Sequence, residues 1–86
     1  MKFLHYDVFL NYGEAVRVDL DAQANVCLMD SFNFQNYRAG RSFRYHGGKA
    51  ERSPVVLRAP HAGQWHVVID LGGYAGQVSA SVNVIR

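Results

Sequence analysis

The chain has 86 residues, of which 49% are hydrophobic and 19% charged, and its formal net charge is +2 at pH 7. This length fits one hydrophobic core and not two, and the composition excludes a disordered chain, so we expect a single domain over residues 1–86. One cysteine excludes an internal disulfide framework, and no apolar run approaches the ~20 residues of a membrane span, so a reducing cytoplasm is the expected location.

The hydrophobic pattern has a period of two along most of the chain, which is the spacing of a strand with one buried face. A first strand is predicted over residues 2–10 and ends at the turn Asn11-Tyr12-Gly13. Alternation predicts a second strand over 16–20, and after the polar break at 21–25 the apolar run 26–29 predicts a third. Further strands are predicted, between glycine and proline breaks, over 43–46, 55–59, 64–71 and 78–84.

About seven to eight short strands with short connections, and no segment of helical period, predict an all-β fold. Short connections favour antiparallel pairing, so the expected architecture is an antiparallel β-sandwich of jelly-roll-like form. The residues predicted to form its core are Val16, Val18, Leu20, Val26, Leu28, Val55, Leu57, Trp65, Val67, Ile69, Val78, Val82 and Val84.

Residues 31–49 break this pattern, because they mix aromatic, amide and arginine side chains without sustained periodicity. Charge gathers in the same region: residues 37–58 carry six basic side chains against one acidic, whereas residues 1–36 carry two basic against five acidic. A long irregular segment inside a small domain is uncommon and is often functional. We therefore expect 31–49 to be a long surface loop that carries the site.

Several separated motifs occur in one order along the chain: Lys2-Phe3-Leu4-His5-Tyr6-Asp7, Leu28-Met29-Asp30, Asn33-Phe34-Gln35-Asn36-Tyr37, Tyr45-His46-Gly47-Gly48, and Pro60-His61-Ala62-Gly63 with Trp65. In these motifs the whole chain resembles a small bacterial family catalogued as domain of unknown function 1883. The resemblance implies a β-sandwich without an assigned activity. In some relatives this domain is joined to a signalling domain of the Toll/interleukin-receptor type, which implies a sensing or docking role. A looser similarity of architecture, over 26–30 and 63–67, is to jelly-roll domains of secreted proteases.

The candidate binding site lies in the arginine-rich and aromatic part of the irregular segment. Aromatic rings offer stacking faces, and guanidinium groups offer forked donors that suit phosphate or carboxylate. The candidate binding residues are Phe32, Phe34, Tyr37, Arg38, Arg41, Arg44, Tyr45 and His46. Three interpretations remain open: a protein partner bound through residues 32–46, an anionic ligand or single-stranded nucleic acid bound by the same patch, and a structural lid of folded-back aromatics with solvated arginines.

Catalytic and metal-binding patterns are not evident in the sequence. His61 and His66 are five residues apart across a predicted turn, and His5 and His46 are remote in the chain, so we expect ordinary hydrogen-bonded histidines, no metal and no cofactor. Cys27 lies in an apolar strand, where a thiol usually behaves as a small buried hydrophobe. We therefore expect a non-enzymatic binding module. An enzyme would require these histidines to converge with a carboxylate in a cleft.

Overall fold

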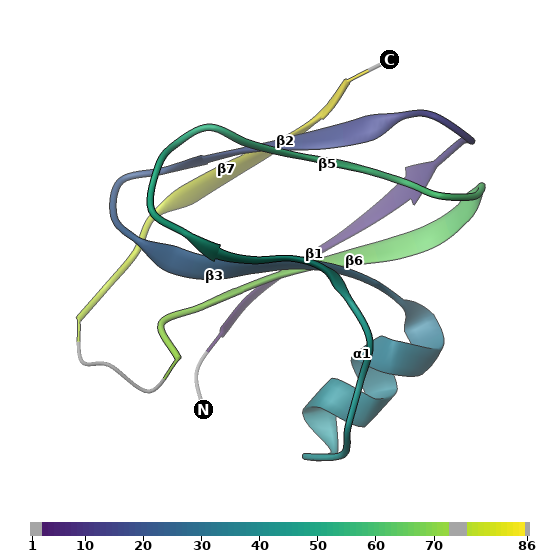
Figure 1. Cartoon of the computed structure of the whole chain (residues 1–86), viewed down its shortest axis with the longest axis horizontal. Helices are drawn as coiled ribbons and strands as arrows, with labels where there is room; N and C mark the ends of the chain where they lie inside the picture. Colours follow the sequence, from purple (N-terminus) through teal and green to yellow (C-terminus); the bar gives the residue numbers. More distant parts are fainter. Residues whose placement is uncertain (1–2, 73–75, 86) are drawn as a thin grey trace.

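The computed structural model describes residues 3–72 and 76–85, which form two antiparallel β-sheets packed face to face (Figure 1). The strands are β1 (Phe3–Leu10), β2 (Ala15–Leu20), β3 (Ala24–Asp30), β4 (His46–Ala50), β5 (Val55–Arg58), β6 (Gly63–Asp70) and β7 (Ala80–Ile85). One sheet has the order β1-β6-β3-β4 and the other the order β5-β2-β7. The predicted antiparallel β-sandwich is confirmed; Lys2, which the first predicted strand includes, lies outside the described residues.

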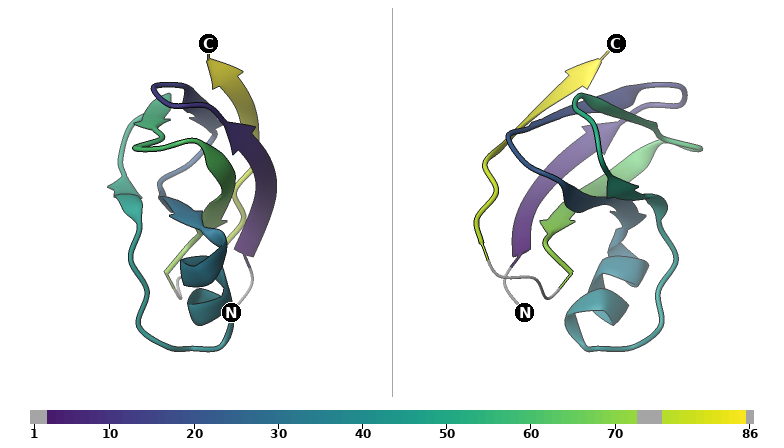
Figure 2. Two further views of the ribbon diagram at one scale, coloured as in Figure 1. Left: turned by 90° about the vertical axis from the view of Figure 1, so that its right-hand side faces the viewer. Right: turned by 60° about the vertical axis from the view of Figure 1, so that its left-hand side comes forward.

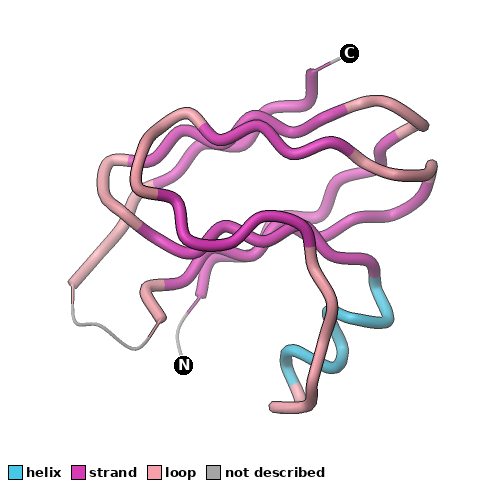
Figure 3. Tube along the Cα trace, viewed as in Figure 1, coloured by secondary structure: helices cyan, strands magenta, loops and turns pink. Residues whose placement is uncertain are grey.

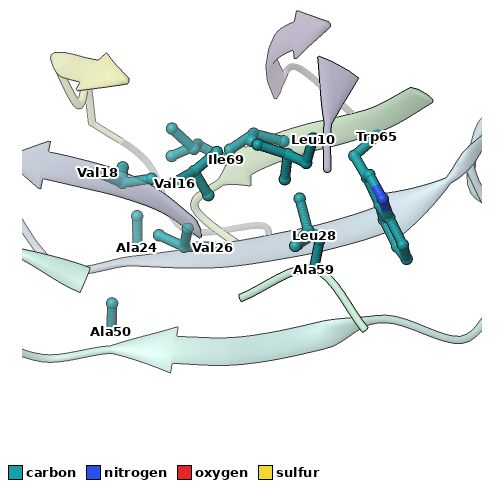
Figure 4. Packing of buried hydrophobic residues seen from close by; sticks show 11 residues of the cluster. Leu10, Val16, Val18, Ala24, Val26, Leu28, Ala50, Ala59, Trp65 and Ile69 are labelled. Atoms are coloured by element: carbon teal, nitrogen blue, oxygen red, sulfur yellow. The ribbon is translucent and has the colours of Figure 1, made fainter. Parts of the chain in front are cut away.

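The main core lies between the two sheets and is built from alternate residues of their strands (Figure 4). All thirteen residues predicted for the core pack in this cluster, seven of them buried and six half-buried. Strand β1 adds four more, which the prediction omitted: Leu4, Tyr6, Val8 and Leu10. Fully burying one Val or Leu side chain stabilises a fold by about 1.5–3 kcal/mol. Because each strand carries several apolar residues at alternate positions, burying them between two sheets contributes most of the stability of the sandwich.

The central strands of the four-stranded sheet are covered on both faces. In β6 the residues Trp65–Asp70 are all buried, although their side chains point alternately to the two sides. Trp65, Val67 and Ile69 face the main core, whereas Val68 packs in a second cluster on the outer face of the sheet. A strand buried on both faces requires a second covering element.

That covering element is the helix α1 (Ser31–Arg38), so the prediction that residues 31–38 form an irregular loop is wrong. Asp30 caps the helix by accepting a hydrogen bond from the backbone N–H of Asn33 at 2.8 Å, and the chain leaves the helix at Ala39. Two helical turns are too short to show a clear period and too short to be stable alone. The helix is stabilised instead by packing on the sheet, where its Phe34 side chain is buried. The described residues contain no helix that could span a membrane.

After α1 the chain returns beside the helix and enters β4 (Figures 1 and 3). The return segment, residues 39–45, is bonded to the helix: the backbone N–H of Arg41 donates to the carbonyl of Asn36 at 2.9 Å, and that of Arg44 donates to the Asn33 side chain at 2.7 Å. The views in Figure 2 agree that helix and return segment lie side by side.

The predicted strand over 43–46 is wrong in position, because Gly47 and Gly48 do not end a strand but lie inside β4, opposite Cys27 and Val26. Both glycines do adopt positive φ, as the sequence suggested. At Gly47 a Cβ atom would overlap the carbonyl oxygen of Val26, so only glycine fits this close approach of the two strands.

Candidate functional site

The structure divides the eight predicted binding residues into exposed and anchoring groups. Six are exposed and together form what we call the α1 surface: Phe32, Arg38, Arg41, Arg44, Tyr45 and His46. Phe32 and Tyr45 are solvent-exposed aromatic residues, with exposed fractions of 73% and 47%. Phe34 is buried and Tyr37 half-buried. These last two side chains therefore hold the segment onto the sheet.

Phe34 and Tyr37 anchor the helix through an apolar and a polar contact. Phe34 packs in the outer cluster with Cys27, Met29 and Val68. The Tyr37 hydroxyl donates to Asp70 Oδ2 at 2.8 Å. Burial raises the pKa of Tyr37, and the hydrogen bond to Asp70 and its negative charge raise it further, so the phenol keeps the proton that it donates.

Asp70, which receives this hydrogen bond, is itself a buried carboxylate on β6. Its Oδ1 atom accepts hydrogen bonds from the Asn25 side chain and from the backbone N–H of Gly72, each at 2.9 Å. A buried carboxylate is tolerated when its oxygens accept hydrogen bonds, and the Asp70 carboxylate accepts three. The polar anchor of α1 is thus part of a complete network.

Two hollows open on the α1 surface, and both are lined by Asn33 and Arg44. The first has a volume of about 430 Å³ and is also bounded by Tyr45, His46 and Trp65. The second has a volume of about 450 Å³ and is also lined by Phe32, Asn36, Ser42 and Phe43. Arg44 therefore stands between two concave sites.

The arginines of this surface are not neutralised by any carboxylate in the described part of the chain. Among residues 3–72 and 76–85, no carboxylate forms an ion pair with Arg38, Arg41 or Arg44. The Arg41 Nε atom donates to the Asn36 side chain at 3.0 Å, and the Arg38 guanidinium lies 5.7 Å from the centre of the Phe34 ring. Both of these contacts are with uncharged groups, so the surface keeps its positive charge.

A second site, which sequence reasoning missed, lies on the outer face of β1 and β6. His5 Nε2, Asp7 Oδ1 and His66 Nδ1 all lie within 3.0 Å of one another. His5 and His66, which are remote in the chain, are therefore neighbours in the structure. Antiparallel pairing places Asp7 opposite His66, and His5 lies two residues from Asp7 on the same face.

His66 is the buried member of this cluster and is held on several sides. The hydroxyl oxygen of Ser31, the first residue of α1, lies 2.8 Å from His66 Nε2. The Phe34 ring stacks on His66 at 4.6 Å and on His5 at 4.0 Å. Burial lowers the pKa of His66, although the negative charge of Asp7 acts to raise it, so this imidazole is neutral near pH 7.

Two chemistries are compatible with this geometry. His66 lies between the Ser31 hydroxyl and the Asp7 carboxylate, which is the order of a proton relay to a serine nucleophile. His5, Asp7 and His66 also bring three potential ligand atoms close together, as the ligands of a metal site are. The remaining histidines lie elsewhere: His61 and His46 each contact the Trp65 ring.

The fold and its covered face define a small two-sheet antiparallel β-sandwich, whose four-stranded sheet carries the short helix α1 on its outer side. A family model described as "Domain of unknown function (DUF1883)" matches residues 1–86. The chain therefore belongs to this family, and the resemblance seen in its motifs is confirmed. No curated protein matches the chain, and no solved structure does.

Proposed function

We propose that this domain is a non-enzymatic binding module that engages an acidic segment of a protein partner through the α1 surface. The observation that carries the proposal is the position of Arg44. Its guanidinium has no hydrogen-bond partner in the described part of the chain, and it stands between two hollows. A carboxylate of the partner would meet this forked donor while neighbouring side chains enter the hollows.

The exposed rings favour a protein partner over single-stranded nucleic acid. Binders of single strands use a row of aromatic faces on which successive bases stack. Here the rings between Phe32 and Tyr45 are turned inward, because Phe34 is buried and Tyr37 and Phe43 are half-buried against the sheet. Two exposed rings, beside arginines that form no ion pair with any described residue, have the composition of a protein-interaction hot spot.

The α1 surface is also held in one shape before binding. Hydrogen bonds from Arg41 and Arg44 to α1 fix the return segment, and the anchors Phe34 and Tyr37 fix the helix. A surface that is already ordered loses less conformational entropy when it binds. Part of the cost of association is therefore removed.

The test measures fluorescence anisotropy of labelled glutamate-rich peptides that contain one phenylalanine, with a labelled oligothymidine as the competing probe. We expect the triple variant Arg38→Ala, Arg41→Ala and Arg44→Ala to bind the peptide at least about tenfold more weakly than wild type. Its folding should be almost unchanged, since exposed charges contribute little to stability.

A matched control removes three basic side chains elsewhere: Lys49→Ala, Arg52→Ala and Arg58→Ala, all of them exposed. This variant loses the same net charge as the first but no side chain of the α1 surface, so it should retain peptide binding. Equal weakening in both triple variants, or unaltered peptide binding by the first, would overturn the proposal. Tight oligothymidine binding with a steep decrease as salt rises would replace the protein partner by a nucleic acid.

A further inference from the structure

We propose that His5, Asp7 and His66 form a binding site for a divalent first-row transition-metal ion. The site lies on the outer face of β1 and β6, at the start of α1. It is separate from the hollows lined by Arg44, and its occupant is an ion rather than a protein segment.

The first argument is the mutual distance of the three ligand atoms. His5 Nε2 lies 3.0 Å from Asp7 Oδ1, His66 Nδ1 lies 2.8 Å from the same oxygen, and the two nitrogens are 2.9 Å apart. Neutral imidazoles cannot make all three contacts favourable. If both nitrogens carry a proton, the two N–H groups oppose each other, and if either lacks one, its lone pair faces the carboxylate. A cation at the centre turns all three contacts into attraction.

The second argument is the size of this triangle. Two ligands at right angles, each 2.0–2.1 Å from an ion, are separated by about 2.9 Å. The three contacts thus fit three adjacent positions of one coordination sphere. Two imidazoles and one carboxylate suit zinc, iron, cobalt, nickel and copper rather than magnesium or calcium, which prefer oxygen ligands. The remaining positions stay open to water or to a further ligand.

The third argument is the support that the fold gives to the ligands. They come from paired strands rather than loops, which limits their movement. The Ser31 hydroxyl lies against the second nitrogen of His66 at 2.8 Å, where an outer partner fixes the orientation of a ligating ring. Exposure rises from 11% for the His66 side chain to 28% for His5 and 61% for Asp7, so an ion can enter from solvent.

The experiment uses the whole chain without a histidine tag, first treated with a chelator and then titrated with Zn²⁺, Co²⁺ and Mg²⁺ in a calorimeter. We expect one Zn²⁺ or Co²⁺ per chain and no binding of Mg²⁺. Co²⁺ should also give a d–d absorption spectrum, and Zn²⁺ should raise the melting temperature.

The variants Asp7→Asn and His5→Gln alter exposed ligands, so both should fold. Each should weaken Zn²⁺ binding at least about tenfold and abolish the Co²⁺ spectrum, because one of three ligands is lost. Ser31→Ala should weaken binding by about 10- to 100-fold while keeping the spectrum. The matched control His61→Gln removes an exposed histidine away from the site and should bind like wild type.

The proposal is overturned if Asp7→Asn and His5→Gln bind Zn²⁺ like wild type, or if His61→Gln weakens binding as much as they do. It is also overturned if the metal-free chain takes up a fluorophosphonate at Ser31, because that result identifies the proton relay as the function of His66 and Asp7. Circular dichroism of each variant separates lost ligands from lost folding.

Discussion

The role of α1 as an integral part of the domain predicts a large effect of Phe34→Ala. The ring is 4% exposed and packs in the outer cluster against Cys27, Met29 and Val68. Removing a buried phenylalanine ring costs about 3–5 kcal/mol, and we expect about 3 kcal/mol here because this cluster is small. For a domain of 60–100 residues each kcal/mol shifts the melting temperature by about 4–8 °C, so the decrease should be about 12–24 °C.

The assay is urea unfolding, with the melting temperature and helical circular dichroism as further measurements. The matched control is Phe32→Ala, the same substitution in the same helix at an exposed ring, which should change stability by less than about 0.5 kcal/mol. Equal effects of the two substitutions would refute the packing of α1 on the sheet. A decrease below about 1 kcal/mol for Phe34→Ala would refute it as well.

Two further predictions follow from the buried groups beneath α1. Because the pKa of Tyr37 is raised, the unfolded chain loses this proton above pH 10 while the folded chain keeps it, so the free energy of unfolding should fall as pH rises above 10. In urea titrations Tyr37→Phe should make this pH dependence weaker, and a pH dependence that the substitution leaves unchanged would contradict the prediction. Burial raises the pKa of Cys27 to about 11, so the native thiol should resist Ellman's reagent at pH 8 and react once urea unfolds the chain. Rapid labelling of the folded protein would contradict the burial.

The sandwich and its main core could be predicted because burial on one face imposes a period of two. Val16 and Val18 on β2, and Val67 and Ile69 on β6, repeat this spacing clearly, and each of them packs between the sheets. Local alternation therefore carried enough information to identify the strands, although it does not specify which strands pair.

The irregular segment was harder to predict because its structure depends on contacts that are distant in sequence. Two turns of helix form there because Phe34 finds an apolar face to cover, and the sequence of the helix alone contains no strong period. Gly47 lies in a strand because β4 must approach Val26 closely, whereas a glycine pair in a sequence usually indicates a turn.

The histidine cluster could not be predicted for the same reason. His5 and His66 are separated by 61 positions, and only the register of β1 against β6 brings them together. The available signal was that His5 and Asp7 share one face of a predicted strand and that His66 alternates with apolar residues in another. Without the pairing of these strands, that signal describes two polar faces and no site.

Helix α1 connects the two proposed sites through the geometry of its own side chains. Positions two apart in a helix point about 200° away from each other, so Phe34 faces the sheet while Phe32 faces water. The buried side of α1 covers the imidazoles of His5 and His66 through Phe34, and the exposed side carries Phe32 of the α1 surface. Displacing Phe34 would therefore remove support from the metal ligands and from the docking surface together, although the two sites share no ligand-binding residue.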